Sequence, residues 1–239
     1  MWYEDYARSK MHANDGSHDI YHAQRVAHNV KHIMKPVDPM LQCALACAWL
    51  HDVCDKKYTD TENEIRSIKR FCRRVKFPEI DILENVIKNI SFTKLRNEGP
   101  PSLASSNMFD VWNIVSQSDM IEALGITGMI RTLMYQGYIN NNIEEAFSYA
   151  RNHLLKCIDY ITIKEFKEEA TRRTFVMSQW LSNLDNDVIY SISKVFFQFG
   201  KEKKSFDDAI TFLKNETSDE AQMFYSVFSE EVRFSAEAC

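Results

Sequence analysis

The segment "MLQCALACAWLHDVCD", residues 40–55, limits the possible folds of this chain more than any other. Nearly every residue from Met40 to Leu50 is apolar, so a helix formed here has no polar face to present to water and must be surrounded by other helices. Only six glycines and five prolines occur in 239 residues, which leaves few helix breakers and few hairpin turns. We therefore predict an all-α fold around this central helix, which ends in a His-Asp pair.

Apolar residues at helical spacing predict further helices along the chain. We expect them at residues 19–34, 60–77, 81–92, 109–124, 143–161 and 163–184, with additional helices in the remainder. Asp60 and Thr61 suit the N-cap of the second of these, and Gly125 suits the end of the fourth. The stretch "TKLRNEGPPSLASSN", residues 93–107, is polar and rich in Pro, Gly and Ser, and we predict a binding loop or lid there.

The charge and cysteine content exclude several classes of protein. The chain holds 29 basic and 34 acidic residues, a net charge of -5, so nucleic acid is disfavoured as its main partner. It has neither an N-terminal apolar signal region nor a run of about 20 apolar residues, so we expect no membrane partner. The six cysteines show no paired CxxC spacing, and several lie in apolar runs, which favours reduced thiols and a cytoplasmic location.

The His-Asp pair at the end of the apolar segment predicts a metal site. A buried carboxylate is costly unless another charge pairs with it, and a divalent cation is one such partner. In chain order, His22, His51, Asp52 and Asp119 offer two imidazoles and two carboxylates. This set suits manganese, iron, zinc or magnesium, and it leaves coordination positions open for water and a phosphate oxygen.

The sequence around these residues resembles the HD-domain superfamily of metal-dependent phosphohydrolases. The similarity is to the short bacterial subgroup of the YedJ/YpgQ type, and it extends over about residues 12–184 in several segments that occur in the same order. The matching segments are "SHDIYHAQRV", "WLHDVCDKKY", "NISF", "PPSL", "VSQSDMIEALGITGMIRT" and "EEATRRTFVMSQWL". The resemblance implies an HD-domain helical bundle over residues 1–184. Residues 185–239 would form a helical extension packed on it or appended to it.

The resemblance implies that His22, His51, Asp52 and Asp119 bind one divalent ion. Manganese is the preferred metal, with magnesium, cobalt, nickel or iron as alternatives. Some members of the subgroup cleave nucleoside triphosphates to monophosphate and pyrophosphate, and we expect this reaction here. No histidine lies between His51 and His153, so the additional histidine pair of two-metal HD proteins is absent.

Two residues that follow the His-Asp pair, Asp55 and Lys57, match the subgroup as well. Asp55 is expected to orient the attacking water, and Lys57 or its neighbour Lys56 to bind phosphate. The alternative is that all three belong to a solvated run of charges.

Four further residues match the subgroup outside this segment, and one of them, Arg173, is given no role from the sequence. His18, one helical turn before His22, would assist catalysis by facing the metal-bound water or a phosphate, or it would pack at the helix start. Arg25 would hold a ligand carboxylate or contact phosphate, or form a structural ion pair. Arg131 is expected to bind substrate.

The sequence departs from the subgroup around Asp119. Gln117 replaces an acidic residue, Met120 an arginine and Glu122 an aspartate. Loss of the arginine removes a candidate phosphate contact, which affects the expected substrate more than the metal.

Other functions stay open at this stage. One is a 5'-nucleotidase of the HD type that acts on nucleoside monophosphates, and another is a non-catalytic HD module that senses a nucleotide. The expected partner in each case is a small phosphate ester, and a homodimer is kept open.

Overall fold

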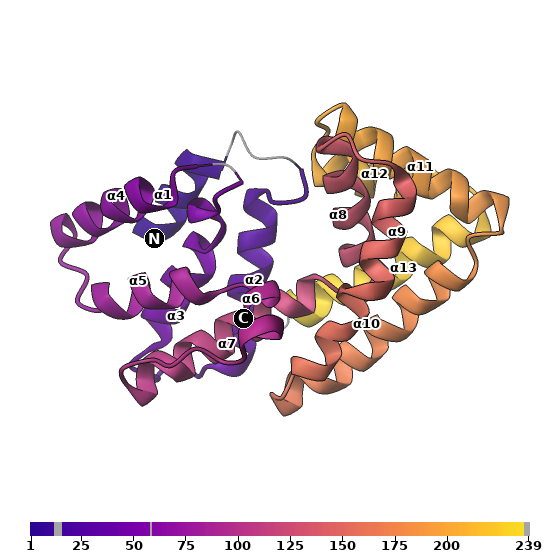
Figure 1. Cartoon of the computed structure of the whole chain (residues 1–239). Helices are drawn as coiled ribbons and strands as arrows, with labels where there is room; N and C mark the ends of the chain where they lie inside the picture. The colour runs from indigo at the N-terminus through magenta and orange to yellow at the C-terminus, as the bar shows by residue number, and fades with distance from the viewer. Residues whose placement is uncertain (12–15, 58, 237–239) are drawn as a thin grey trace. The chain divides into compact units, whose positions relative to one another are not determined.

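A computed structural model describes residues 1–11, 16–57 and 59–236 of the chain (Figure 1). These residues form thirteen α-helices and two 3-10 segments, and no β-strand occurs among them, so the all-α prediction is confirmed. None of the described helices combines the length and the apolar character needed to cross a membrane. The elements are α1 (Trp2–Met11), α2 (Ile20–Ile33), α3 (Leu41–Leu50), η1 (Asp52–Cys54), α4 (Thr61–Arg74), α5 (Ile80–Asn89), α6 (Phe92–Glu98), α7 (Ser106–Glu122), α8 (Gly125–Tyr138), α9 (Ile143–Asn152), η2 (Leu154–Tyr160), α10 (Lys164–Ser182), α11 (Asp187–Lys201), α12 (Phe206–Asn215) and α13 (Asp219–Ala236).

The chain divides into two compact units. The first contains α1 to α6 and α7 as far as Asp119, and the second contains residues 16–19 and everything from Met120 to Ala236. The predicted boundary between residues 184 and 185 stays a prediction, and residues 12–15, 58 and 237–239 lie outside the described part of the chain.

Helix α3 forms the centre of the first unit. Every residue from Cys43 to Leu50 is buried, and α1, α2 and α5 pack against the helix. Because the helix has no polar side, any arrangement that exposed one face to water would lose hydrophobic burial. The central helix predicted from residues 40–50 is therefore present.

Helix α4 lies at the surface of the first unit, as its amphipathic pattern predicts. The Asp60 carboxylate caps it by accepting a hydrogen bond of 3.2 Å from the Asn63 backbone N–H. Its apolar side carries Phe71, on which the Trp2 ring of α1 stacks with the ring centroids 5.7 Å apart. The N-cap prediction at Asp60 or Thr61 is correct, with Asp60 as the cap.

The predicted loop at residues 93–107 is wrong in its first part. Ser91 accepts a hydrogen bond from the Lys94 backbone N–H and starts α6, whose Leu95 is buried. The helix ends at Gly99, which has a φ of +80°, a conformation that favours glycine. The irregular stretch is thus confined to residues 99–105. The Ser91 cap and the burial of Leu95 stabilise α6 although the sequence of this stretch is polar.

Helix α8 forms the centre of the second unit, with α9, α10, α11, α12 and α13 packed around it. The closest approach is to α11, where a Cβ added to Gly200 would clash with the Met134 carbonyl of α8. We predicted Gly125 as the end of a helix reaching Leu124, and this is wrong in detail. Helix α7 ends at Glu122, and Gly125, with a φ of +75°, is the first residue of α8.

The segment predicted as one helix over residues 143–161 is divided. The α-helix α9 ends at Asn152, and η2 continues the segment as 3-10 helix. Helix α10 follows within the predicted range 163–184, and α9, η2 and α10 pack against one another. Beyond it, α11 to α13 account for the additional C-terminal helices.

A network of buried charges, which we call the Arg173 network, joins α7, α10 and α13 within the second unit. Arg173 of α10 is fully buried, and its guanidinium lies 2.6 Å from Glu169 and 3.3 Å from Glu122. It also donates a hydrogen bond of 2.9 Å to the backbone carbonyl of Glu231 on α13. The network holds these helices together, because the buried guanidinium donates its hydrogen bonds to groups on each of them.

The Glu231 carboxylate caps the first turn of α8. It accepts hydrogen bonds from the backbone N–H groups of Ile126 and Thr127, at 2.8 and 3.0 Å, and from the Thr127 hydroxyl at 2.7 Å. Burial raises the pKa of Glu231, while Arg173 and these donors act in the opposite direction. A carboxylate at a helix N-terminus satisfies N–H groups that have no partner within the helix.

Candidate metal centre

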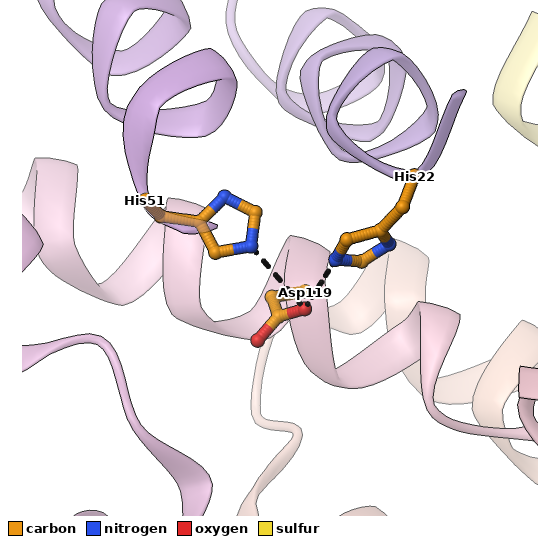
Figure 2. Close-up of side chains that lie close together, drawn as sticks. All are labelled: His22, His51 and Asp119. Atoms are coloured by element: carbon orange, nitrogen blue, oxygen red, sulfur yellow. Dashed lines mark ion pairs between the residues drawn. The ribbon is translucent and has the colours of Figure 1, made fainter. Parts of the chain in front are cut away.

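Three side chains from separate helices of the first unit converge on one point (Figure 2). His22 comes from α2, His51 follows the last residue of α3, and Asp119 comes from α7. One nitrogen or oxygen of each lies within 4.8 Å of those of the other two. The Asp119 carboxylate lies 3.2 Å from Nε2 of His22 and 3.8 Å from Nε2 of His51.

Asp52 lies against the same two imidazoles. Its Oδ2 is 3.5 Å from Nε2 of His22, and its Oδ1 is 3.3 Å from Nε2 of His51. All four predicted metal ligands therefore meet in the first unit. We refer to His22, His51, Asp52 and Asp119 as the four-ligand cluster.

The four-ligand cluster is buried but open on one side. His22 is 1% exposed, His51 7% and Asp52 9%, whereas the Asp119 side chain is 28% exposed. A ligand could therefore reach the cluster on the side of Asp119.

A backbone contact determines which His51 nitrogen faces the cluster. The Nδ1 atom of His51 lies 2.8 Å from the Ala48 carbonyl oxygen. A carbonyl can only accept, so Nδ1 carries the hydrogen and donates it. In the neutral ring the lone pair is then on Nε2, the atom directed at the carboxylates of Asp52 and Asp119. An N–H to a backbone carbonyl is the usual second contact of a metal-binding histidine.

A second contact links the two helices that carry His22 and Asp119. The Asn29 side-chain amide, two turns after His22 on α2, donates a hydrogen bond of 3.2 Å to the carbonyl of Ser118 on α7. Both groups are buried. Sequence reasoning missed Ala48 and Asn29, although the position of Ala48 three residues before His51 is a local signal that could have been used.

The donor set fits a divalent cation. With both imidazoles neutral, the two carboxylates give the four-ligand cluster a formal charge of about -2. Two imidazole lone pairs and two carboxylates directed at one point repel one another unless a proton or a cation lies between them. Nitrogen and oxygen donors together suit first-row divalent metals and magnesium. The cluster can therefore hold a metal ion, and the donor types do not select one metal among these.

The residues after the His-Asp pair lie close to one another in the first unit. The Asp55 carboxylate accepts a hydrogen bond of 2.9 Å from the Lys57 backbone N–H and lies 3.6 Å from its ammonium nitrogen. Lys56 is exposed. Their predicted roles, orientation of water by Asp55 and phosphate binding by Lys56 and Lys57, stay predictions.

The other predicted site residues have varied surroundings. Arg25 is half-buried on α2, one turn after His22. In the second unit, Nδ1 of His18 lies 2.8 Å from the Ser17 hydroxyl, and its ring meets Tyr135 edge-on. Arg131 donates hydrogen bonds to the backbone carbonyls of Ser17 and Glu122. The catalytic role of His18 and the substrate-binding roles of Arg25 and Arg131 stay predictions.

The three departures from the subgroup have structural explanations. The Gln117 amide donates a hydrogen bond of 2.7 Å to Asn113 within α7. The Met120 side chain is buried, and Glu122 is the carboxylate that pairs with Arg173. Met120 and Glu122 thus contribute to the interior of the second unit.

Comparisons with known proteins agree with the fold and with the resemblance. No protein-family model matches the chain. The chain is 24% identical over 177 residues to the uncharacterized protein YpgQ of Bacillus subtilis strain 168. The matched region covers 72% of this chain and 84% of YpgQ. The crystal structure of B. subtilis YpgQ in complex with ADP superposes with a TM-score of 0.61 at 21% identity, covering 77% of this chain and 97% of that one. A crystal structure from Lactobacillus plantarum gives 0.62 at 21% identity, covering 79% and 96%. The resemblance to YpgQ is therefore confirmed in sequence and in fold.

Proposed function

We propose that this YpgQ-like chain of the HD-domain family is a metal-dependent phosphohydrolase that converts nucleoside triphosphates to monophosphate and pyrophosphate. The observation that carries the proposal is the convergence of His22, His51 and Asp119 within 4.8 Å, with Asp52 against both imidazoles. A divalent ion, preferably manganese, would supply Lewis acidity there, lowering the pKa of water and polarising a phosphoryl oxygen.

The nucleotide class of the substrate is supported by the relative. The structure of YpgQ in complex with ADP shows that a protein of this fold binds an adenine nucleotide. A nucleoside triphosphate extends that ligand by one phosphate. In the proposed reaction the oxygen of water forms a bond to the α-phosphorus, the bond from this phosphorus to the bridging oxygen breaks, and pyrophosphate leaves.

Residues of the chain would orient the reactants. The Ala48 carbonyl holds the His51 ring so that Nε2 faces the metal position. Asp55 would accept a hydrogen bond from the attacking water, and Lys56 and Lys57 would neutralise the leaving phosphate. His18, Arg25 and Arg131 remain candidates for contact with the substrate phosphates. We further propose a cytoplasmic enzyme, with a homodimer left open.

A screen of metals against substrates tests the proposal. Purified protein is stripped of metal, loaded with Mn, Co, Ni, Mg or Zn, and assayed with nucleoside tri-, di- and monophosphates. We expect pyrophosphate release from triphosphates with manganese. Asp52→Ala and Asp119→Ala should each reduce turnover by at least about 100-fold, because each removes a metal ligand. Asp81→Ala, an exposed carboxylate on α5, is the matched control and should retain full activity.

The products separate the competing functions. Release of orthophosphate from monophosphates alone would indicate a 5'-nucleotidase. Nucleotide binding without turnover by any metal-loaded form would indicate a sensing module. Turnover by Asp52→Ala or Asp119→Ala equal to that of the parent protein would contradict the assigned site.

A further inference from the structure

A basic groove lies in the first unit between α1 and α4, whose labels are adjacent in Figure 1. It has a volume of about 650 Å³ and is lined by Tyr6, Lys10, Ser67, Arg70, Arg73 and Arg74. None of these residues belongs to the four-ligand cluster or to the other predicted site residues. The volume is within the range of pockets that bind small molecules.

The charge of this groove is opposite to that of the whole chain. Residues 66–76 include six basic residues and no acidic residue, in a protein of net charge -5. Two of the nearby ammonium groups have carboxylate partners, since Lys69 pairs with Glu84 and Lys10 lies 3.0 Å from Glu64. Within the described part of the chain, no ion pair to a carboxylate is found for Arg70, Arg73 or Arg74.

The arginines are spaced so that they repel one another. Arg70 and Arg74 are four residues apart on α4, and Arg70 and Arg73 are three apart, so their side chains are neighbours on the helix surface. Like charges at such spacings destabilise a helix. Two basic residues in the last turn would already complement the helix dipole. Arg70 lies before that turn, so the helix dipole does not explain why all three arginines occur together.

Contacts with neighbouring side chains orient two of the arginines and the tyrosine that line the groove. The Arg70 guanidinium donates a hydrogen bond of 3.2 Å to the Ser67 hydroxyl, and the Arg74 guanidinium lies over the Phe71 ring at 5.3 Å. On the α1 side, the Tyr6 hydroxyl donates to Glu64 at 2.7 Å, which fixes the aromatic wall. Three guanidinium groups on one side and an ammonium on the other match the several negative oxygens of a phosphate chain.

We propose that this groove is a second anion site, which binds the oligophosphate chain of a small molecule. The ligand is either an inorganic oligophosphate or the phosphate chain of a nucleotide. Binding requires no metal and no hydrolysis, so the proposal does not depend on the proposed function. The basic residues of this site line one groove and the chain as a whole is acidic, which favours a small anion over a nucleic acid.

Calorimetric titration of tripolyphosphate tests this site. It is carried out at low ionic strength without metal in an Asp119→Asn protein, which removes binding at the four-ligand cluster. The double variant Arg70→Gln/Arg74→Gln should weaken tripolyphosphate binding by at least about ten-fold, because two charge-assisted contacts are lost. The matched control is Arg66→Gln, an exposed arginine on the same helix that does not line the groove. It should change affinity by less than about two-fold.

Equal weakening by both changes would show a diffuse charge effect and overturn the proposal, as would unchanged binding by the double variant. ATP and AMP distinguish the two sources of the ligand. AMP should bind far more weakly than tripolyphosphate, and equal binding of AMP and ATP would overturn recognition of the phosphate chain. ATP that binds as tightly as tripolyphosphate supports a site open to nucleotides, and ATP that binds more weakly supports a site for inorganic oligophosphate.

Two further measurements keep the result interpretable. Thermal melting without ligand should show the double variant within about 5 °C of the parent, because relief of arginine repulsion offsets the loss of the contacts that Arg70 and Arg74 make with Ser67 and Phe71. Pyrophosphate release by Arg70→Gln/Arg74→Gln in the otherwise unchanged protein should equal that of the parent. Failure of the groove and failure of the proposed hydrolase are therefore measured separately.

Discussion

The four-ligand cluster of the first unit and the Arg173 network of the second unit both bury charged groups, but they balance the charge differently. In the Arg173 network, a buried guanidinium and helix N–H groups meet the carboxylates of Glu122, Glu169 and Glu231. In the four-ligand cluster, the ion pairs between its members join only imidazoles and carboxylates. The Arg173 network stabilises the fold through a guanidinium of the chain itself, whereas nitrogen and oxygen donors that converge on one point are suited to bind a cation.

The largest expected effect is in the second unit. Arg173→Met should lower the free energy of unfolding by about 3–5 kcal/mol, because it leaves buried carboxylates without their positive partner. Urea denaturation measures the change. Arg172→Met is the matched control. Arg172 also pairs with Glu169, but it is one-third exposed, so its loss should cost about 1 kcal/mol or less. Equal losses of stability for the two variants would contradict the claim that the buried arginine contributes more than the surface arginine.

The next effect concerns the cluster of the first unit. Manganese at about 100 times its dissociation constant should raise the free energy of unfolding by about 2.7 kcal/mol, since only the folded chain assembles the four ligands. Thermal melting with and without metal measures this. Asp119→Asn should abolish the response, whereas Glu231→Gln in the second unit should retain it. A metal response that survives Asp119→Asn would refute the assigned cluster.

A smaller effect is expected where α13 caps α8. Glu231→Gln should cost about 1–3 kcal/mol, because the amide nitrogen cannot accept hydrogen bonds from Ile126 and Thr127. Chemical denaturation gives the value. Its neighbour Glu230 is exposed and pairs only with Arg172 among the described residues, so Glu230→Gln should change stability by no more than about 0.5 kcal/mol. Comparable losses would mean that the cap contributes nothing specific.

A last effect, which appears only at alkaline pH, concerns two thiols of the first unit that burial keeps neutral and that differ in this from the four-ligand cluster. Burial raises the pKa of Cys54 to about 12 and that of Cys72 to about 11. Because the folded pKa values are raised, stability is fully present below the unfolded thiol pKa near 8.5 and is lost as the pH rises toward 11 to 12. Each thiol contributes at most about 1.4 kcal/mol per pH unit.

Denaturation between pH 7 and 10 measures that slope. The double variant Cys54→Ala/Cys72→Ala should be less stable than the parent at pH 7 but show a shallower decline above pH 9. Parallel declines in the two proteins would contradict the assignment of the slope to these thiols.

The elements that were predicted correctly are those whose signals are local. The apolar run of residues 40–50 can only form a surrounded helix, and Asp60 caps the next one within three residues. Helix α6 was missed because the Gly, Pro and Ser content of residues 93–107 obscured the Ser91 cap and the buried Leu95. Helix α8 was missed as a whole because Gly125 was interpreted as the end of a helix, although a glycine with positive φ can also begin one.

The site follows the same rule. His51 and Asp52 are adjacent, and their position after an apolar helix already indicated a need for a cation. His22 and Asp119 were added through their order in the chain and the family resemblance. The contact between Glu231 and Thr127 has no local signal, since 104 residues separate the partners and the C-terminal segment has no match in the resemblance.

The capping of α8 by Glu231 has a consequence for the order of folding. The first turn of a helix that begins at residue 125 receives its acceptor only from residue 231. On a ribosome, residue 231 must therefore have been synthesised before the first turn of α8 receives this cap. The four predicted metal ligands, by contrast, all precede residue 120. The members of the four-ligand cluster have thus been synthesised more than 100 residues before the group that caps α8.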